Sequence, residues 1–146
     1  MSTEYCPLPS RLPASETAAV DRMLKAKRVA VVGLSDDPSR PSHGIASYLL
    51  AHGYDVIPVN PKHAEVLGRK CYARLADVPG LVDLVNVFRR SDACAEVTVD
   101  AIAAGAKGVW LQAGIRNEEA RRRAEEAGVD FVQDRCIMVE HMQRRR

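Results

Sequence analysis

Cysteine is scarce in this chain, with only Cys6, Cys71, Cys94 and Cys136 among 146 residues. The four are widely spaced, form no Cys-x-x-Cys pair and have no histidine at metal-ligand spacing, so the pattern predicts no metal site. The N-terminus also lacks a basic stretch followed by an apolar block, as a secretory signal requires. We therefore expect reduced thiols and a cytoplasmic protein.

Long apolar runs and an excess of one charge are also missing. No run reaches the roughly 20 residues of a bilayer-spanning helix. The 21 basic and 19 acidic side chains give a formal net charge of +2, too small for a broad positive field toward nucleic acid or a membrane surface. The one basic cluster, at 144–146, is interpreted as a solvated tail. We expect neither nucleic acid nor membrane as a partner.

The composition is that of an ordinary globular domain, with 47% hydrophobic and 27% charged residues. A length of 146 residues fits one domain. Residues 1–14 contain Pro7, Pro9 and Pro13 and are predicted to form an irregular N-terminal arm. Residues 15–146 are predicted to form the domain.

Short apolar runs alternate with amphipathic segments along this domain. The runs at 29–32, 56–59, 83–88, 108–111 and 129–132 are predicted strands. Ser91 and Asn117 are expected to cap two of the intervening helices, and residues 68–79 to hold only a short helix around 72–77. The alternation predicts an α/β fold with a doubly wound, parallel five-stranded sheet and helices on both faces. We expect this Rossmann-like sheet to have the Rossmann strand order.

Ligands of such sheets bind beyond the carboxyl ends of the strands, which directs attention to the loop at 33–44. Ser35, Ser39 and Ser42 provide hydroxyl donors there, and Arg40 provides a guanidinium that fits phosphate oxygens. An anion at the N-terminus of the following helix is one interpretation; a surface loop whose serines cap that helix is the other. His43 can touch a phosphate, or cap and pack.

The loop departs from the dinucleotide-binding fingerprint. After Gly33 the next glycine is Gly44, so no Gly-x-Gly-x-x-Gly motif exists. The end of the second predicted strand carries Asn60, Pro61 and Lys62 rather than the acidic residue that holds a nicotinamide ribose. The lysine suits a phosphate, so the pattern disfavours a nicotinamide cofactor.

The third predicted strand ends at Phe88, and Arg89 and Arg90 follow it. Together with Lys62 and Arg40, the arginines would make a locally positive crevice in a nearly neutral chain. Phe88 can pack against an adenine or a pantetheine arm, or belong to the core.

Several blocks in order resemble those of the bacterial CoA-binding domain proteins, small stand-alone relatives of the N-terminal domain of the succinyl-CoA synthetase alpha subunit. They are VAVVGLS (29–35), PSRPSH (38–43), VIPVNPK (56–62), DLVNVFRR (83–90), GVWLQAGIR (108–116) and DRCIMVEH (134–141). The resemblance covers nearly all of residues 24–141.

This resemblance implies a CoA-binding Rossmann-like domain. It assigns CoA phosphates to the first loop, the nucleotide to the second and the pantetheine to the loops after the third and fourth strands. The implied residues are Gly33, Ser35, Ser39, Arg40, Ser42 and His43, then Asn60, Pro61 and Lys62, then Phe88, Arg89 and Gln112. The synthetase subunit carries its phosphorylated histidine in a second domain that this sequence does not contain, so its ligase chemistry is not carried over.

The leading hypothesis is therefore a non-catalytic module that binds coenzyme A or acyl-CoA as a carrier, sensor or regulator. One alternative is an NAD(P)-binding oxidoreductase or redox sensor. A further alternative is an enzyme acting on acyl-CoA thioesters, with Cys136 or His43 in a catalytic role. The sheet edge and the proline-rich arm can each support a homodimer.

Overall fold

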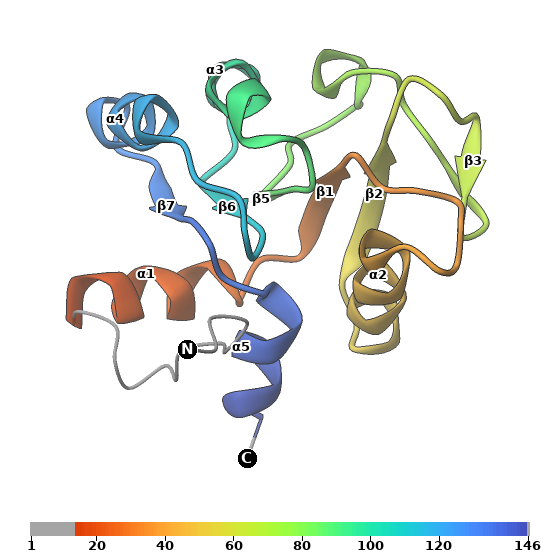
Figure 1. Cartoon of the computed structure of the whole chain (residues 1–146), viewed down its shortest axis with the longest axis horizontal. Coiled ribbons are helices and arrows are strands. Elements are labelled where there is room, and N and C mark those ends of the chain that lie inside the picture. The colour runs from red at the N-terminus through yellow and green to blue at the C-terminus, as the bar shows by residue number, and fades with distance from the viewer. Residues whose placement is uncertain (1–13, 146) are drawn as a thin grey trace.

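The computed structural model describes residues 14–145, so the predicted N-terminal arm lies outside the described residues. The main sheet has five parallel strands in the order β2-β1-β5-β6-β7 (Figure 1). They are β1 (Arg28–Val32), β2 (Asp55–Val59), β5 (Leu84–Val87), β6 (Gly108–Leu111) and β7 (Asp130–Val132). This arrangement confirms the predicted α/β fold class.

The strand order corrects one expectation. In the Rossmann order β5 would lie beyond β2, but it pairs with β1 instead. The outer edge of β2 is already covered by the chain that follows it: β3 (Glu65–Val66) and β4 (Arg69–Lys70) form a hairpin, and the Tyr72 N–H donates to the Pro58 carbonyl at 3.0 Å. The order therefore reverses between β1 and β5, and ligands of open α/β sheets bind at that point.

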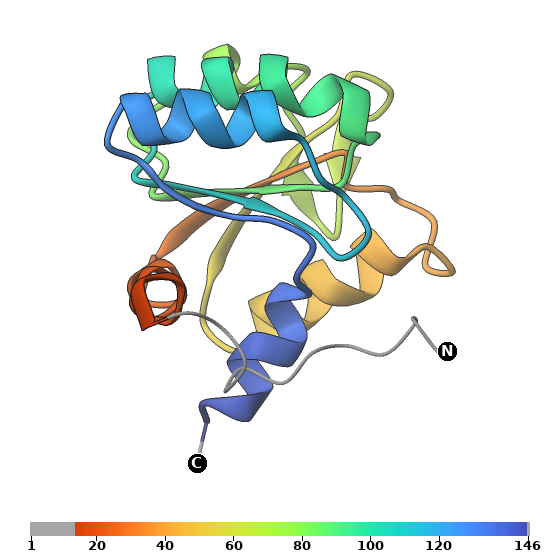
Figure 2. The same cartoon turned by 60° about the vertical axis from the view of Figure 1, so that its left-hand side comes forward.

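Helices cover both faces of the sheet (Figure 2), and the central strands are therefore buried on both sides. One face packs against α1 (Ala14–Met23), α2 (Pro41–Ala51) and α5 (Ile137–Gln143), and the other against α3 (Cys94–Ala103) and α4 (Glu118–Glu126). Alternate residues of β1 enter the two cores, Val29 and Val31 on one face and Ala30 and Val32 on the other. None of the described helices is long and apolar enough to cross a membrane.

The helix ends give one confirmation and one correction. Asn117 caps α4 as predicted, its side chain accepting from the Ala120 N–H at 2.8 Å. Ser91 does not cap α3, which begins three residues later at Cys94. A 3₁₀ turn at Ser91–Ala93 precedes the helix. The Ser91 hydroxyl instead accepts from the Arg116 N–H at 3.1 Å.

Two segments differ from the sequence prediction. The short helix expected around 72–77 is a 3₁₀ helix at Leu75–Asp77. The β3–β4 hairpin and helix α5 were not predicted.

Candidate functional site

Gly33 brings the backbone of the first loop against the end of β5. Its φ is +89°, a left-handed conformation in which a Cβ atom would lie 2.7 Å from the carbonyl oxygen of Phe88. The Gly33 N–H donates to the Val59 carbonyl at 2.8 Å. The ends of β1, β2 and β5 are thereby joined at a position that accepts only glycine.

Asn60 forms the second wall through a turn with Pro61, Lys62 and His63. The His63 N–H donates to the Asn60 carbonyl at 3.4 Å, and the Lys62 N–H donates to the Asn60 side-chain oxygen at 2.9 Å. The Asn60 amide nitrogen in turn donates to the Leu34 carbonyl at 3.1 Å. An asparagine stands here because the position needs both a donor and an acceptor, which an aspartate cannot provide.

Two serine hydroxyls stabilise the first loop. Ser42 is buried and accepts from the Ser35 N–H at 3.1 Å, and the Ser35 hydroxyl accepts from the Asp37 N–H at 3.0 Å. Each hydroxyl still has its hydrogen to donate. Ser39 is used within the loop, because its N–H and hydroxyl both donate to Asp37. These bonds lower the pKa of the Asp37 carboxyl.

Helix α2 begins beside these hydroxyls. Its N-cap residue, Arg40, makes no side-chain capping bond, Pro41 occupies the first helical position, and the first turn contains no acidic residue. The positive end of the helix dipole is therefore not neutralised within the helix, which suits an anionic group.

Two hollows with shared walls lie over these residues, and together we call them the crevice. One has a volume of about 380 Å³ and is lined by Gly33, Ser35, Asp36, Arg40, Pro41, Ser42, Asn60, Lys62, His63 and Phe88. The other has about 270 Å³ and is lined by Val32, Gly33, Val59, Asn60, Pro61, Lys62, Ala73, Phe88 and Arg89. Volumes of this order are those of small-molecule sites.

Three cations of the crevice form no ion pair with a carboxylate in the part of the chain that the structure describes. Within residues 14–145, no ion pair involves Arg40, Lys62 or Arg89. The exposed arginines of α4 differ in this respect, since Arg122 pairs with Glu119 and Glu126. Three unpaired cations and one helix N-terminus therefore meet at the point where the strand order reverses.

The structure brings together most of the residues named from the sequence. Those lining the crevice are Gly33, Ser35, Arg40, Ser42, Asn60, Pro61, Lys62, Phe88 and Arg89. Ser39, His43 and Gln112 lie outside it. Gln112 is buried, and its side-chain oxygen accepts from the Asn86 amide at 3.3 Å and from the Ile137 N–H at 3.4 Å. The roles of all these residues in ligand binding stay predictions.

Asp36 and His63 also line the crevice, but neither was predicted from the sequence as a site residue. Asp36 lies within the loop at 33–44, and His63 directly follows Lys62. The signal that could have identified them is that charged residues in the loops after two neighbouring strands come close together.

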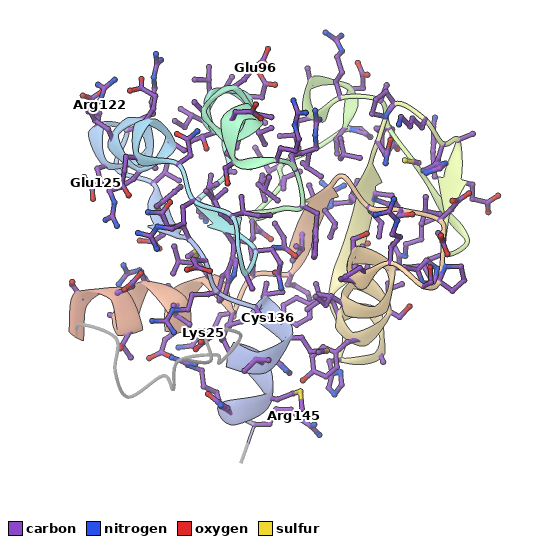
Figure 3. The ribbon with its side chains drawn as sticks, viewed as in Figure 1. Lys25, Glu96, Arg122, Glu125, Cys136 and Arg145 are labelled. Carbon is purple, nitrogen blue, oxygen red and sulfur yellow. The ribbon has the colours of Figure 1, made fainter. Side chains whose placement is uncertain are left out.

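The described cysteines lie outside the crevice. Burial raises the pKa of the Cys94 thiol to about 11, and burial also raises the pKa of the Cys71 thiol. Cys136 immediately precedes α5, as Figure 3 shows. The unreactive thiol forms of Cys71 and Cys94 are thus favoured near neutral pH.

A separate hollow of about 300 Å³ lies at the opposite, amino ends of the strands, beside the end of α1. Its carboxylates already have partners: Asp130 accepts from Arg22 at 2.8 and 3.0 Å, and Asp83 accepts from the backbone N–H groups of Lys27 and Arg28. Ligand sites of parallel sheets belong to the other edge, so we take the crevice as the candidate site.

The chain belongs to the CoA-binding domain family, whose description "CoA binding domain" applies to residues 27–142. It is 43% identical over 117 residues to the uncharacterized protein YneT of Bacillus subtilis, covering 80% of this chain and 87% of that protein. A solved structure of a hypothetical protein from Pyrococcus horikoshii OT3 shares 40% identity with a TM-score of 0.84, covering 97% of this chain and 98% of that one.

The chain is also similar to a part of a much larger enzyme. The chain is 31% identical over 101 residues to an ADP-forming acetate–CoA ligase of Archaeoglobus fulgidus. The match covers 68% of this chain and only 15% of the ligase.

Proposed function

We propose that this protein binds coenzyme A or an acyl-CoA in the crevice as a non-catalytic carrier, sensor or regulatory module. The observation that carries the proposal is the group of unpaired cations, Arg40, Lys62 and Arg89, around the uncapped N-terminus of α2. Coenzyme A carries a diphosphate and a 3′-phosphate, so it offers several anionic groups to such a site. Membership of the CoA-binding domain family supports the same ligand.

The donor set of the crevice fits these groups. Arg40 offers a planar fork for phosphate oxygens, and Lys62 offers a compact charge. The Ser35 and Ser42 hydroxyls add neutral donors on the same side. Phe88 and the aliphatic part of Arg89, which lies over Gly33, provide apolar surface for the adenine or the pantetheine arm.

The alternative of an NAD(P)-dependent enzyme has less support. The Asn60 side chain is uncharged and already bonds the Leu34 carbonyl and the Lys62 N–H, so it does not stand in for the acidic residue that holds a ribose. The further alternative assigns chemistry on acyl-CoA thioesters to Cys136 or His43, and neither residue lines the crevice. A thioester hydrolysis assay of Cys136→Ala and His43→Ala variants tests that alternative.

The test is the affinity for CoA of Arg40→Ala and Lys62→Ala variants. A hydrogen bond to a charged group contributes roughly 1.5–3 kcal/mol, so each variant should weaken binding by about tenfold or more. Arg122→Ala is the matched control, because it removes an equal charge from α4, far from the crevice (Figure 3). Equal affinities for all three variants and the wild type would refute the proposed site.

A further inference from the structure

A charged pair spans the crevice between its two loops. The Nδ1 atom of His63, in the turn after β2, lies 3.5 Å from a carboxylate oxygen of Asp36, in the loop after β1. The His63 side chain is 21% exposed and that of Asp36 59% exposed. Both residues line the same hollow as Arg40 and Lys62.

The carboxylate of Asp36 is out of place in a site for anions. It opposes a bound phosphate wherever its charge is not neutralised. Arg40 and Lys62 lie within the same hollow, but neither forms an ion pair with Asp36 among the described residues. The protonated imidazole of His63 is the cation placed to neutralise it.

We propose that His63 makes ligand binding in the crevice proton-linked, so that the phosphate of the ligand binds together with one proton taken up by the imidazole. The inference rests on the proposed function and specifies how that site is regulated. Solvent supplies the proton, which forms an N–H bond at Nε2 while Nδ1–H faces Asp36. The imidazole charge changes from 0 to +1, and the crevice gains one positive charge.

The fold holds His63 in this position. The turn that carries it is closed by the bond from the His63 N–H to the Asn60 carbonyl. The Asn60 side-chain amide links that turn to the first loop by donating to the carbonyl of Leu34, two residues before Asp36. The charged residues that line the hollow together with His63 are Asp36 and Arg40 from the first loop and Lys62 from its own turn. A bound phosphate would add a second anion to this group, beside the Asp36 carboxylate.

The other histidines are placed differently. Tyr48 of α2 contacts both His52, the residue directly after that helix, and His141 of α5. The His141 Nδ1 atom is 2.7 Å from the Tyr48 hydroxyl, and the His52 Nδ1 atom is 2.8 Å from the Tyr48 carbonyl. His43 lies outside the crevice. Proton uptake on binding should therefore depend on His63.

The experiment measures proton uptake when CoA binds. Calorimetric titrations at pH 6.5 and pH 8 in two buffers of different ionisation enthalpy give the affinity and the protons bound per ligand. Phosphomonoesters also titrate near pH 6, so His63→Gln provides the baseline for the ligand itself. We expect the ratio of affinities at pH 6.5 and pH 8 to be about fivefold larger in the wild type than in His63→Gln, at the lower end of measured couplings. The excess proton uptake should be lost in the variant.

Two further variants sharpen the test. Asp36→Asn removes the opposing charge, so it should bind CoA more tightly than the wild type at pH 8 and take up fewer protons. His52→Gln is the matched control, and it should keep the wild-type pH dependence.

Three results would overturn the inference. Equal proton uptake by His63→Gln and the wild type would do so, as would loss of the uptake in His43→Gln but not in His63→Gln. If the wild type binds CoA at neither pH, the proposed function fails and the inference fails with it. If CoA binds but the proton uptake does not depend on His63, the inference fails while the proposed function stands.

Discussion

Replacing Gly33 with alanine tests whether the crevice depends on the close approach of the Gly33 backbone to the Phe88 backbone. Two costs apply at this position. The φ of +89° places an L-residue in the left-handed region, which costs roughly 1–2 kcal/mol. The added Cβ would also lie 2.7 Å from the Phe88 carbonyl oxygen, which is backbone and cannot move away as a side chain can. We expect Gly33→Ala to lower the free energy of unfolding by about 3 kcal/mol in total, with overpacking providing the remainder.

Gly53→Ala is the matched control, because it separates the two costs. Its φ is +92°, almost the same, but no atom lies within 4 Å of the added Cβ. It should therefore cost only the roughly 1–2 kcal/mol of backbone strain. Urea denaturation of both variants gives the difference, which is the cost of the contact with Phe88. Equal destabilisation by the two substitutions would refute the close approach of the first loop to β5.

Two further predictions concern side-chain chemistry. Asn60→Asp should lower the free energy of unfolding at pH 7 by about 1–3 kcal/mol, because a carboxylate replaces the donor to the Leu34 carbonyl; urea denaturation measures this, and a variant as stable as the wild type would contradict it. Burial, and then the neighbouring His52, lower the pKa of His141. The unfolded chain therefore binds a proton first, so stability should be constant above the ordinary imidazole pKa of about 6.5 and fall as the pH drops through it. Urea midpoints between pH 8 and pH 5 should show this slope and a smaller one in His141→Gln; an equal slope would contradict the assignment.

The central strands were predictable because they are buried on both faces. Four consecutive apolar residues such as 29–32 indicate a covered parallel strand without any knowledge of its neighbours. The strand order was not predictable in this way. It depends on the β3–β4 hairpin and Tyr72 taking the outer edge of β2, which is a long-range choice that no local pattern records.

Helix α5 was missed because its local signals are weak. It has seven residues, and Cys136 at its N-cap makes no side-chain capping bond. Tertiary contacts hold it instead: Ile137 is fully buried in the core, and Arg144, directly after the helix, donates to Asp21 of α1 at 2.7 Å.

The loops of the candidate site were predictable, but the direction of individual side chains was not. Residues after parallel strands gather at one edge, which placed Arg40 and Lys62 near each other. Gln112 also follows a strand, yet it faces inward to bind Asn86 and the Ile137 N–H. The Asp36–His63 pair depends on the neighbouring positions of β1 and β2, which only the folded chain shows.

The most direct test of the account is calorimetric titration of the purified wild-type protein with CoA, acetyl-CoA, dephospho-CoA and NADP. The account predicts that CoA and acetyl-CoA bind, that dephospho-CoA binds more weakly because one phosphate is missing, and that NADP binds weakest. Binding of NADP without binding of any CoA form would contradict the account and favour a nicotinamide site in the same crevice.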